Sequence, residues 1–195
     1  MHTYSIDTEE RRNIIFYIAV LSIFINSLLK SLILQYSNLT FLQVPAAFTI
    51  FGFVYIIFDQ YLWKLKILSF CVKTPNLNGL WEGQYESSYE GMIVPAKLKI
   101  KQTWTRIEII SLNGEKETQS NSSMAGIFTK NGGEICLKFE YANDSNSCMK
   151  DDRPSHSGFN CLKYDKNENA LSGFYYTDKN RKTYGSASFK YTGSK

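Results

Sequence analysis

Residues 75–89 read PNLNGLWEGQYESSY, and this stretch separates two unlike halves of the chain. Leu77-Asn78-Gly79 has the composition of a turn. After it, positions 81, 83, 85 and 87 (Trp, Gly, Tyr, Ser) alternate with more polar ones, as in a β-strand with one buried face. Pro75 stiffens the segment, and no flexible Gly/Ser spacer lies between Trp63 and Trp81. The stretch therefore predicts a rigid joint leading into a β domain, with Trp81 filling the end of that domain nearest a membrane.

Before the joint, the chain carries two long apolar segments, residues 13–34 and 41–63. Each is long enough to cross a hydrocarbon core, which takes about 20 residues. The six residues between them carry no formal charge, and so short a loop demands an antiparallel helical hairpin. A signal peptide is disfavoured because no small-residue cleavage site is evident and a second apolar segment follows at once.

Basic residues flank the two segments and predict their orientation. Arg11 and Arg12 precede the first segment, and Lys64, Lys66 and Lys73 follow the second. The positive-inside rule then places residues 1–12 and everything from Pro75 onward in the cytoplasm.

Polar and small residues form stripes along both predicted helices. Ser22, Asn26 and Lys30 recur every four residues on one side of the first helix, and Thr49 and Gly52 lie on one face of the second. Small residues allow close approach in lipid, and buried polar groups there need partners. The stripes either pack the hairpin against itself, with Lys30 reaching the interface, or support self-association in the membrane through Asn26.

Residues 75–195 consist of short alternating runs separated by turn signals such as Asn113-Gly114 and Asn131-Gly132-Gly133. Near Gln102 no turn residue is found, so one bent strand is an alternative there. About eight antiparallel strands with one apolar face each favour an up-and-down, lipocalin-like barrel, because closure removes exposed edges. The expected strands are residues 79–89, 93–102, 104–112, 116–129, 134–142, 156–164, 169–177 and 181–191.

Several predicted inward positions are too polar or too small to serve as filler alone. They combine aromatic rings, hydroxyls and small residues, which favours a small-molecule pocket, and the alternative is a filled barrel with a Ser/Thr-rich wall. They include Tyr85, Ser87, Gly173, Tyr175, Thr177, Thr183, Gly185 and Ala187.

Composition argues against several classes of protein. The formal net charge is only +4, which is far from the basic patch of a DNA or RNA binder. The four cysteines form no CxxC pair and only two histidines exist, so we expect reduced cysteines and no metal site. No GxSxG elbow, phosphate loop or dinucleotide motif is present, and we expect neither catalytic residues nor a bound cofactor.

Two membrane helices followed at once by PNLNGLWEGQY and about eight strands resemble a known family. It is the two-transmembrane β-barrel effectors of the bacterial cyclic-oligonucleotide anti-phage systems (CBASS). The resemblance covers nearly the whole chain in architecture, and its specific part is the PNLNGLWEGQY corner. It implies a cytosolic barrel that binds a cyclic dinucleotide made during phage infection. Homo-oligomeric assembly in the inner membrane, loss of membrane integrity and death of the infected cell would follow.

A cyclic dinucleotide presents two bases, which stack on aromatic faces, and two phosphates, which attract cations and hydrogen-bond donors. Arg106 and Arg153 are the candidates for phosphate, although alternation places Arg106 opposite Ile107 and Ile109 and therefore on the outer face. The polar loop 142–157 is either a solvated surface loop or a lid that carries Arg153. The stacking candidates are Tyr85, Trp104, Tyr175, Tyr176 and Tyr184, and the hydrogen-bond donors are Ser87, Thr105, Asn121 and Thr177.

Two further hypotheses remain from the sequence. The chain could be a membrane-tethered, lipocalin-like binder of a small apolar ligand, with inert anchor helices. It could also be a structural membrane protein whose barrel is filled by side chains.

Overall fold

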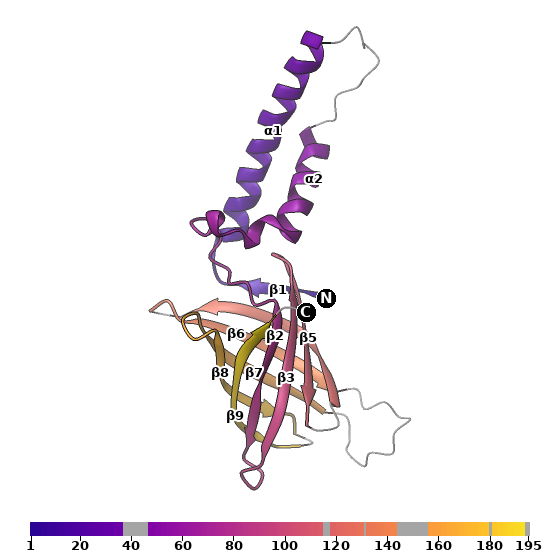
Figure 1. Ribbon diagram of the computed structural model, residues 1–195. Helices are drawn as coiled ribbons and strands as arrows, with labels where there is room; N and C mark the ends of the chain where they lie inside the picture. Colours follow the sequence, from indigo (N-terminus) through magenta and orange to yellow (C-terminus); the bar gives the residue numbers. More distant parts are fainter. Residues whose placement is uncertain (37–46, 115–117, 131, 144–155, 180, 194–195) are drawn as a thin grey trace. The chain divides into compact units, whose positions relative to one another are not determined.

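The computed structural model describes residues 1–36, 47–114, 118–130, 132–143, 156–179 and 181–193 (Figure 1). The chain forms two compact units. One is a helical unit of Thr8–Thr74, and the other is a β unit that combines Met1–Asp7 with Pro75–Lys195.

The helical unit contains a long helix, α1 (Glu10–Tyr36), and a shorter one, α2 (Ala47–Gln60). Within the described residues, one helix, Glu10–Ile33, is long and apolar enough to cross a membrane, with a mean hydropathy of 1.9. Only 14 residues of the predicted second span are α-helical in the described part. Residues 41–46 lie outside that part, and after Gln60 the chain continues in two 3₁₀ turns, η1 (Leu62–Lys64) and η2 (Lys66–Leu68). The prediction of two spanning helices is thus matched by one full-length helix and part of another.

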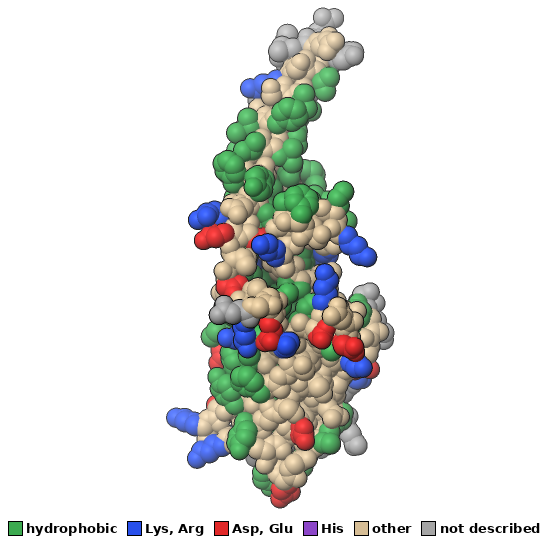
Figure 2. All heavy atoms as spheres, turned by 90° about the vertical axis from the view of Figure 1, so that its left-hand side faces the viewer, with side chains coloured by type: hydrophobic (Ala, Val, Ile, Leu, Met, Phe, Trp, Pro, Cys, Tyr) green, Lys and Arg blue, Asp and Glu red, His purple; other side chains and the backbone are tan. Residues whose placement is uncertain are grey.

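Large apolar side chains are exposed along α1, as the space-filling view shows (Figure 2). Phe16, Ile23 and Phe24 are each at least 60% exposed. Such exposure is unfavourable in water and suits contact with lipid tails. The composition and the surface of α1 together indicate a membrane helix.

The predicted stripe residues have different surroundings in the hairpin. Ser22 is buried and donates a hydrogen bond to the Ile18 carbonyl oxygen at 2.7 Å. Lys30 and Thr49 are exposed, and a Cβ on Gly52 would meet nothing within 4 Å. Asn26 is half-buried, and its Oδ1 has no hydrogen-bond partner among the described residues. Hairpin packing therefore accounts for Ser22 and leaves the Asn26 oxygen unexplained.

The β unit is a closed barrel whose strands follow the order β1-β4-β3-β2-β9-β8-β7-β6-β5. All eight predicted runs are strands, with ends within three residues of those expected. Near Gln102 the chain turns rather than bends, because Thr103 Oγ1 accepts hydrogen bonds from the backbone N–H groups of Thr105 and Arg106. These strands are β2 (Gly79–Ser87), β3 (Ile93–Gln102), β4 (Arg106–Asn113), β5 (Thr118–Thr129), β6 (Ile135–Asn143), β7 (His156–Asp165), β8 (Ala170–Thr177) and β9 (Tyr184–Gly193).

A ninth strand, β1 (His2–Ile6), corrects the prediction of eight. β4 and β5 pair with each other only near their hairpin, from Ile110↔Asn121 to Asn113↔Thr118. Beyond that point β1 lies between them, antiparallel to β4 and parallel to β5. The helical unit is therefore an insertion between the first and second strands of the barrel.

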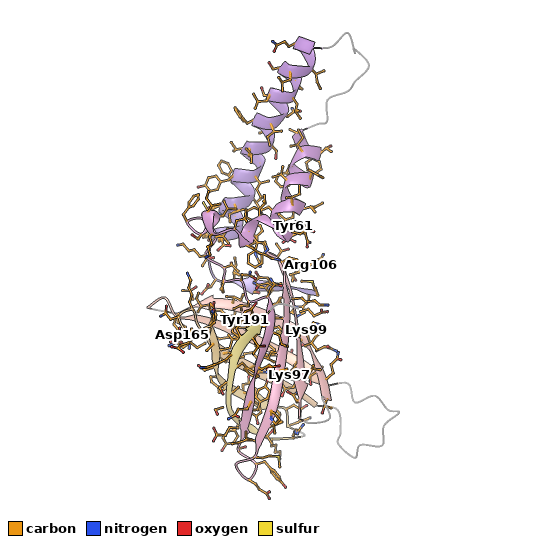
Figure 3. The ribbon with its side chains drawn as sticks, viewed as in Figure 1. Tyr61, Lys97, Lys99, Arg106, Asp165 and Tyr191 are labelled. Atoms are coloured by element: carbon orange, nitrogen blue, oxygen red, sulfur yellow. The ribbon has the colours of Figure 1, made fainter. Side chains whose placement is uncertain are left out.

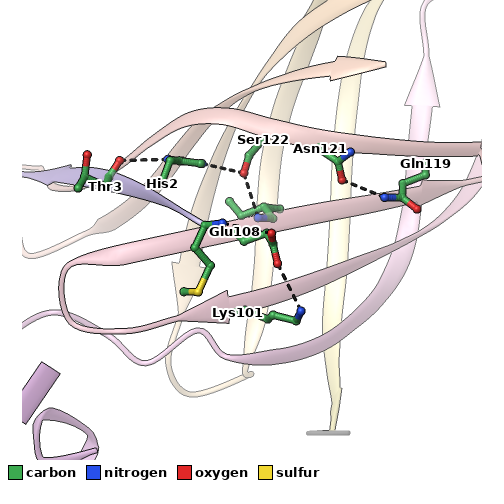
Figure 4. A network of polar contacts seen from close by, with 9 residues as sticks. His2, Thr3, Lys101, Glu108, Gln119, Asn121 and Ser122 are labelled. Atoms are coloured by element: carbon green, nitrogen blue, oxygen red, sulfur yellow. Dashed lines mark hydrogen bonds and ion pairs between the residues drawn. The ribbon is translucent and has the colours of Figure 1, made fainter. Parts of the chain in front are cut away.

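Buried and polar contacts hold β1 in this seam. Tyr4 is 3% exposed, and its hydroxyl donates to the Trp104 carbonyl oxygen at 2.8 Å and accepts from Gln102 Nε2 at 3.2 Å. His2 Nε2 is 2.9 Å from Ser122 Oγ (Figure 4). After the strand, the Asp7 carboxylate accepts the backbone N–H of Thr129 at 2.6 Å. The strand is thus bound by side chains at both of its ends.

The corner at residues 75–79 is fixed to β3 by two amide side chains. Gln102 Oε1 accepts the Leu77 N–H at 2.8 Å, and Gln102 Nε2 donates to the Pro75 carbonyl oxygen at 3.2 Å. Asn78 adds a third hydrogen bond between the corner and β3, because its Oδ1 accepts the Gln102 backbone N–H at 2.6 Å. Trp81 is 1% exposed and donates through Nε1 to the Leu77 carbonyl oxygen at 3.0 Å. These bonds give the corner a defined geometry on its barrel side.

On the helical side, one carboxylate joins the two ends of the insertion. Glu10, in the first turn of α1, is 6% exposed. Its carboxylate accepts the backbone N–H groups of Lys73 at 2.7 Å and Thr74 at 2.9 Å. The segment that enters α1 and the segment that leaves for β2 are therefore bonded to each other.

Candidate functional site

The barrel is filled at one end and hollow at the other. Large buried side chains, among them Trp81, Leu137 and Phe189, fill the end at which the chain leaves for the helical unit. The opposite end holds a pocket of about 330 Å³. Its lining residues are Tyr85, Ser87, Tyr89, Met92, Val94, Asn113, Tyr141, Tyr175, Thr177, Arg181 and Thr183.

Tyrosine rings form the floor of the pocket. Tyr85 on β2 meets Tyr175 on β8 edge to face, with ring centroids 4.9 Å apart, and meets Phe189 on β9 at 5.3 Å. Glycines on the neighbouring strands make room for these rings. A Cβ on Gly158 would overlap the Tyr141 hydroxyl, and one on Gly185 would crowd the Tyr175 ring. The floor is therefore both aromatic and closely packed.

Burial raises the pKa of two pocket tyrosines, Tyr85 and Tyr141. It raises the pKa of Tyr85 well above the ordinary value, while nearby hydrogen-bonding groups of Ser111 and Asn160 oppose the rise. Burial also raises the pKa of Tyr141 to about 12, although the Arg181 guanidinium acts in the opposite direction. At neutral pH both side chains are phenols, so they can donate hydrogen bonds to an anionic or carbonyl oxygen.

Arg181 supplies the positive charge of the pocket. It lies in the turn between β8 and β9, and its backbone N–H donates to the Asp178 carbonyl oxygen at 3.2 Å. Thr177 and Thr183 close the base of that turn, since the Thr183 N–H donates to Thr177 Oγ1 at 2.8 Å. Arg181 is the one charged residue among the described lining residues. The pocket can therefore pair one guanidinium with an anionic group.

Four predicted ligand-binding residues line this pocket, namely Tyr85, Ser87, Tyr175 and Thr177. They lie on β2 and β8 at the hollow end of the barrel. Because they were selected from the inward parity of these two strands, the structure supports that part of the sequence reasoning.

Other predicted residues lie away from the pocket. Trp104 is fully buried beside Tyr4 at the filled end, and Thr105 follows it in the turn before β4. Arg106 is exposed at the start of β4, as the sequence alternation had suggested (Figure 3). Asn121 is exposed and hydrogen-bonded to Gln119 at 3.0 Å (Figure 4). These side chains do not meet the pocket, because three of them belong to the filled end and Asn121 faces outward.

Two predicted stacking residues face outward from the barrel wall. Tyr176 is 49% and Tyr184 66% exposed, and the Tyr176 ring stacks on Phe159 at 5.3 Å. Each is adjacent in its strand to an inward-facing residue, Tyr175 or Gly185, and therefore points to the opposite face. The prediction included both because of their aromatic rings, although alternation places them outside. Arg153 lies outside the described residues.

The sequence reasoning missed several lining residues. Tyr141 shares the inward parity of Leu137 and Phe139, so alternation along β6 could have identified it. Arg181 lies in a turn, where strand alternation gives no information about side-chain direction. Thr183, predicted to face inward, also lines the pocket, and the remaining residues that were missed are Tyr89, Met92, Val94 and Asn113.

Metal-ligating groups do not cluster in the part of the chain that the structure describes, where no three His, Cys, Asp or Glu side chains come together. Cys136 and Cys161 are buried and free, as small apolar residues would be. Cys71 is free and half-buried, and Cys148 lies outside the described residues. The described lining of the hollow end offers aromatic rings, hydroxyls and one guanidinium.

Comparison with known proteins matches both units of the chain. The family model described as "Cap15, cyclic dinucleotide receptor domain" matches residues 72–191, and the one described as "Cap15, TM helices" matches residues 12–64. The chain belongs to the Cap15 family. The resemblance to the CBASS membrane effectors, seen first in the PNLNGLWEGQY corner, is confirmed.

A curated relative supports the Cap15 assignment. The protein named CD-NTase-associated protein 15 from Yersinia aleksiciae is 30% identical over 133 residues. The alignment covers 68% of this chain and 62% of the relative. The Cap15 receptor match includes every residue that lines the pocket, whereas β1 lies outside both matched ranges.

Proposed function

We propose that this chain is a CBASS effector in which the barrel binds a cyclic dinucleotide and the bound state drives assembly of the membrane helices. That assembly disrupts the bacterial inner membrane of the infected cell. The protein acts as a receptor and not as an enzyme. The observation that carries the proposal is the tyrosine-lined pocket with Arg181 at its mouth, inside the range matched by the Cap15 receptor domain.

The pocket fits the chemistry of such a ligand. Tyr85, Tyr141 and Tyr175 offer ring faces and edges to a base, and the guanidinium of Arg181 offers paired donors to a phosphate. A volume of about 330 Å³ is at the lower end for ligand pockets. It accommodates one nucleotide half, and the other half would lie at the mouth beside Tyr89 and Met92.

The barrel itself supports a two-pass topology. Because β1 and β2–β9 form one barrel, Asp7 and Pro75 must be on the same side of any membrane. The segment between them then crosses an even number of times. If α1 crosses, the chain must return through the segment that contains α2. The flanking residues Arg11, Arg12 and Lys64 favour the cytoplasm as the common side.

Assembly requires that the ligand bind the assembled state more tightly than the isolated chain, since a ligand shifts an equilibrium only by its differential affinity. The two chain links at Asp7–Thr8 and Thr74–Pro75 connect the barrel to the hairpin. Asn26, whose Oδ1 lacks a partner in the described hairpin, is a candidate contact between copies. Self-association through the predicted stripe remains part of the proposal.

The test uses the full chain in detergent and in liposomes. Calorimetry against cyclic di-AMP, cyclic di-GMP, cyclic GMP–AMP and cyclic di-UMP should give saturable binding to at least one of them. Chemical crosslinking and dye leakage from liposomes should then increase with that ligand and not with the others. A folded protein that binds none of the four refutes the receptor role.

A second experiment separates the effector from a tethered binder. Both would bind ligand, but replacing residues 8–74 with an unrelated two-helix anchor would preserve the cellular effect of a tethered binder and abolish that of an effector. The hollow end with one guanidinium argues against a barrel filled throughout, and its mixed hydroxyl and aromatic lining argues against a purely apolar ligand.

A further inference from the structure

A buried amide lies beneath the tyrosine floor of the pocket. Asn160, in the middle of β7, is 0% exposed and faces the barrel interior between its register partners Phe139 and Tyr175. Among the residues that the structure describes, neither its Oδ1 nor its Nδ2 has a hydrogen-bond partner. Both polar atoms of one fully buried side chain thus lack a hydrogen bond of standard geometry, although the Tyr85 hydroxyl lies close enough for the amide to lower its pKa.

Such an arrangement is costly for the barrel. A buried amide without hydrogen bonds loses its hydration and gains nothing in return, and native proteins rarely retain one without a function. An apolar side chain of similar size, such as leucine, would fill the same space among Phe139, Tyr175 and Leu162 without that penalty. Beyond the nearby Tyr85 hydroxyl, the amide keeps hydrogen-bonding capacity that a bound ligand can use.

The position of Asn160 indicates where that partner would come from. Tyr175, its neighbour on β8, and Tyr85 both line the pocket, and their rings meet edge to face. The Asn160 amide is near enough to the Tyr85 hydroxyl to oppose the rise in its pKa, as is Ser111. Ser111 in turn donates to the pocket residue Asn113 at 2.8 Å. Polar groups thus continue below the floor, and a shift of the Tyr85 or Tyr175 ring would open Asn160 to the pocket.

We propose that Asn160 is a specificity-determining residue that hydrogen-bonds the edge of the base inserted into the pocket. This inference rests on the proposed cyclic-dinucleotide function. A carboxamide presents a donor and an acceptor side by side, and base edges present the complementary pair in patterns that differ between bases. A pocket of about 330 Å³ admits one nucleotide half, so Asn160 would read one of the two bases.

The test compares Asn160→Leu with the wild-type full chain in detergent, using calorimetry with the four cyclic dinucleotides and thermal unfolding without ligand. Asn160→Leu should raise the Tm of the unliganded barrel, because the unpaired amide is removed. It should weaken binding of the preferred ligand by about tenfold or more and bring the four affinities closer together. Asn160→Asp, which keeps the shape, should change the order of preference among the four.

Ser120→Ala is the matched control. Ser120 is 1% exposed on β5, its Oγ also lacks a partner in the described chain, and it does not line the pocket. This variant should also raise the Tm, with ligand affinities within about twofold of wild type.

The outcomes distinguish the two levels of the proposal. Wild-type protein that binds none of the four ligands overturns the receptor function itself. Wild-type binding with unchanged affinity and preference in both Asn160 variants overturns the role of Asn160 and leaves the receptor intact. A fall in Tm for Asn160→Leu with unchanged preference in Asn160→Asp shows an amide that serves the barrel alone, and this also overturns the inference.

Discussion

Replacing Tyr4 tests whether the N-terminal strand is part of the barrel. The Tyr4 ring is 3% exposed within the barrel core, and its hydroxyl bonds to the Trp104 carbonyl oxygen and to Gln102 Nε2. Removing a buried aromatic side chain costs about 3–5 kcal/mol, and removing the hydroxyl alone costs about 1–2 kcal/mol. Tyr4→Ala should therefore lower the free energy of unfolding by several kcal/mol, and Tyr4→Phe by less than half as much.

The assay is denaturant unfolding of the full chain in detergent, followed by tryptophan fluorescence. Trp63→Phe is placed in every variant, because Trp81 and Trp104 then report on the barrel alone. Ser5→Ala is the control, since Ser5 lies on the same strand and is exposed, and its replacement should change stability by about 0.5 kcal/mol or less. If Tyr4→Ala unfolds at the same denaturant concentration as Ser5→Ala, β1 does not contribute to the folded barrel.

Three further predictions concern the pocket, the membrane stripe and the pH range of stability. Arg181→Met should weaken cyclic-dinucleotide binding by about tenfold or more in calorimetry. Lys182→Met replaces an exposed neighbour outside the pocket lining and should leave the affinity within about twofold of wild type. Equal losses of affinity in the two variants would point to a general charge effect. Asn26→Leu should reduce crosslinked oligomers in liposomes while ligand affinity stays unchanged, and undiminished crosslinking would show that Asn26 serves its own hairpin alone. Burial raises the pKa of Tyr141 to about 12, so between about pH 10 and pH 12 the unfolded chain loses the Tyr141 proton while the folded chain keeps it. Tyr141 should therefore contribute a fall in stability of about 1.4 kcal/mol per pH unit over this range, and chemical denaturation should show a slope smaller by about that amount in Tyr141→Phe.

Turn chemistry and alternation predicted most of the barrel from the sequence. Asn113-Gly114 marks one hairpin, and the alternation along Leu137 and Phe139 fixes which face is buried. These are local signals, which each strand carries within its own residues. β1 has only five residues and is followed almost at once by α1. Its role depends on β4 and β5, about a hundred residues later, and no local pattern contains that information.

The candidate site was predictable where parity could be applied. Tyr85 and Tyr175 follow from the alternation of their own strands, and both line the pocket. Tyr176 and Tyr184 were chosen for their aromatic rings and proved to face outward. Arg181 was missed because a turn side chain is directed by the turn itself and not by the strand period.

The insertion of the helical unit between β1 and β2 also affects the order of events during synthesis. β1 is made first but cannot be placed until β4 and β5 have been translated, more than one hundred residues later. At about 5–20 residues per second, the strand waits on the order of ten seconds. The apolar α1 segment leaves the ribosome within that interval and meets the membrane before the barrel can close. If the helical segment crossed the membrane only once, β1 and the rest of the barrel would lie on opposite sides of the membrane. The barrel can therefore close only in a chain whose helical segment has returned to its starting side.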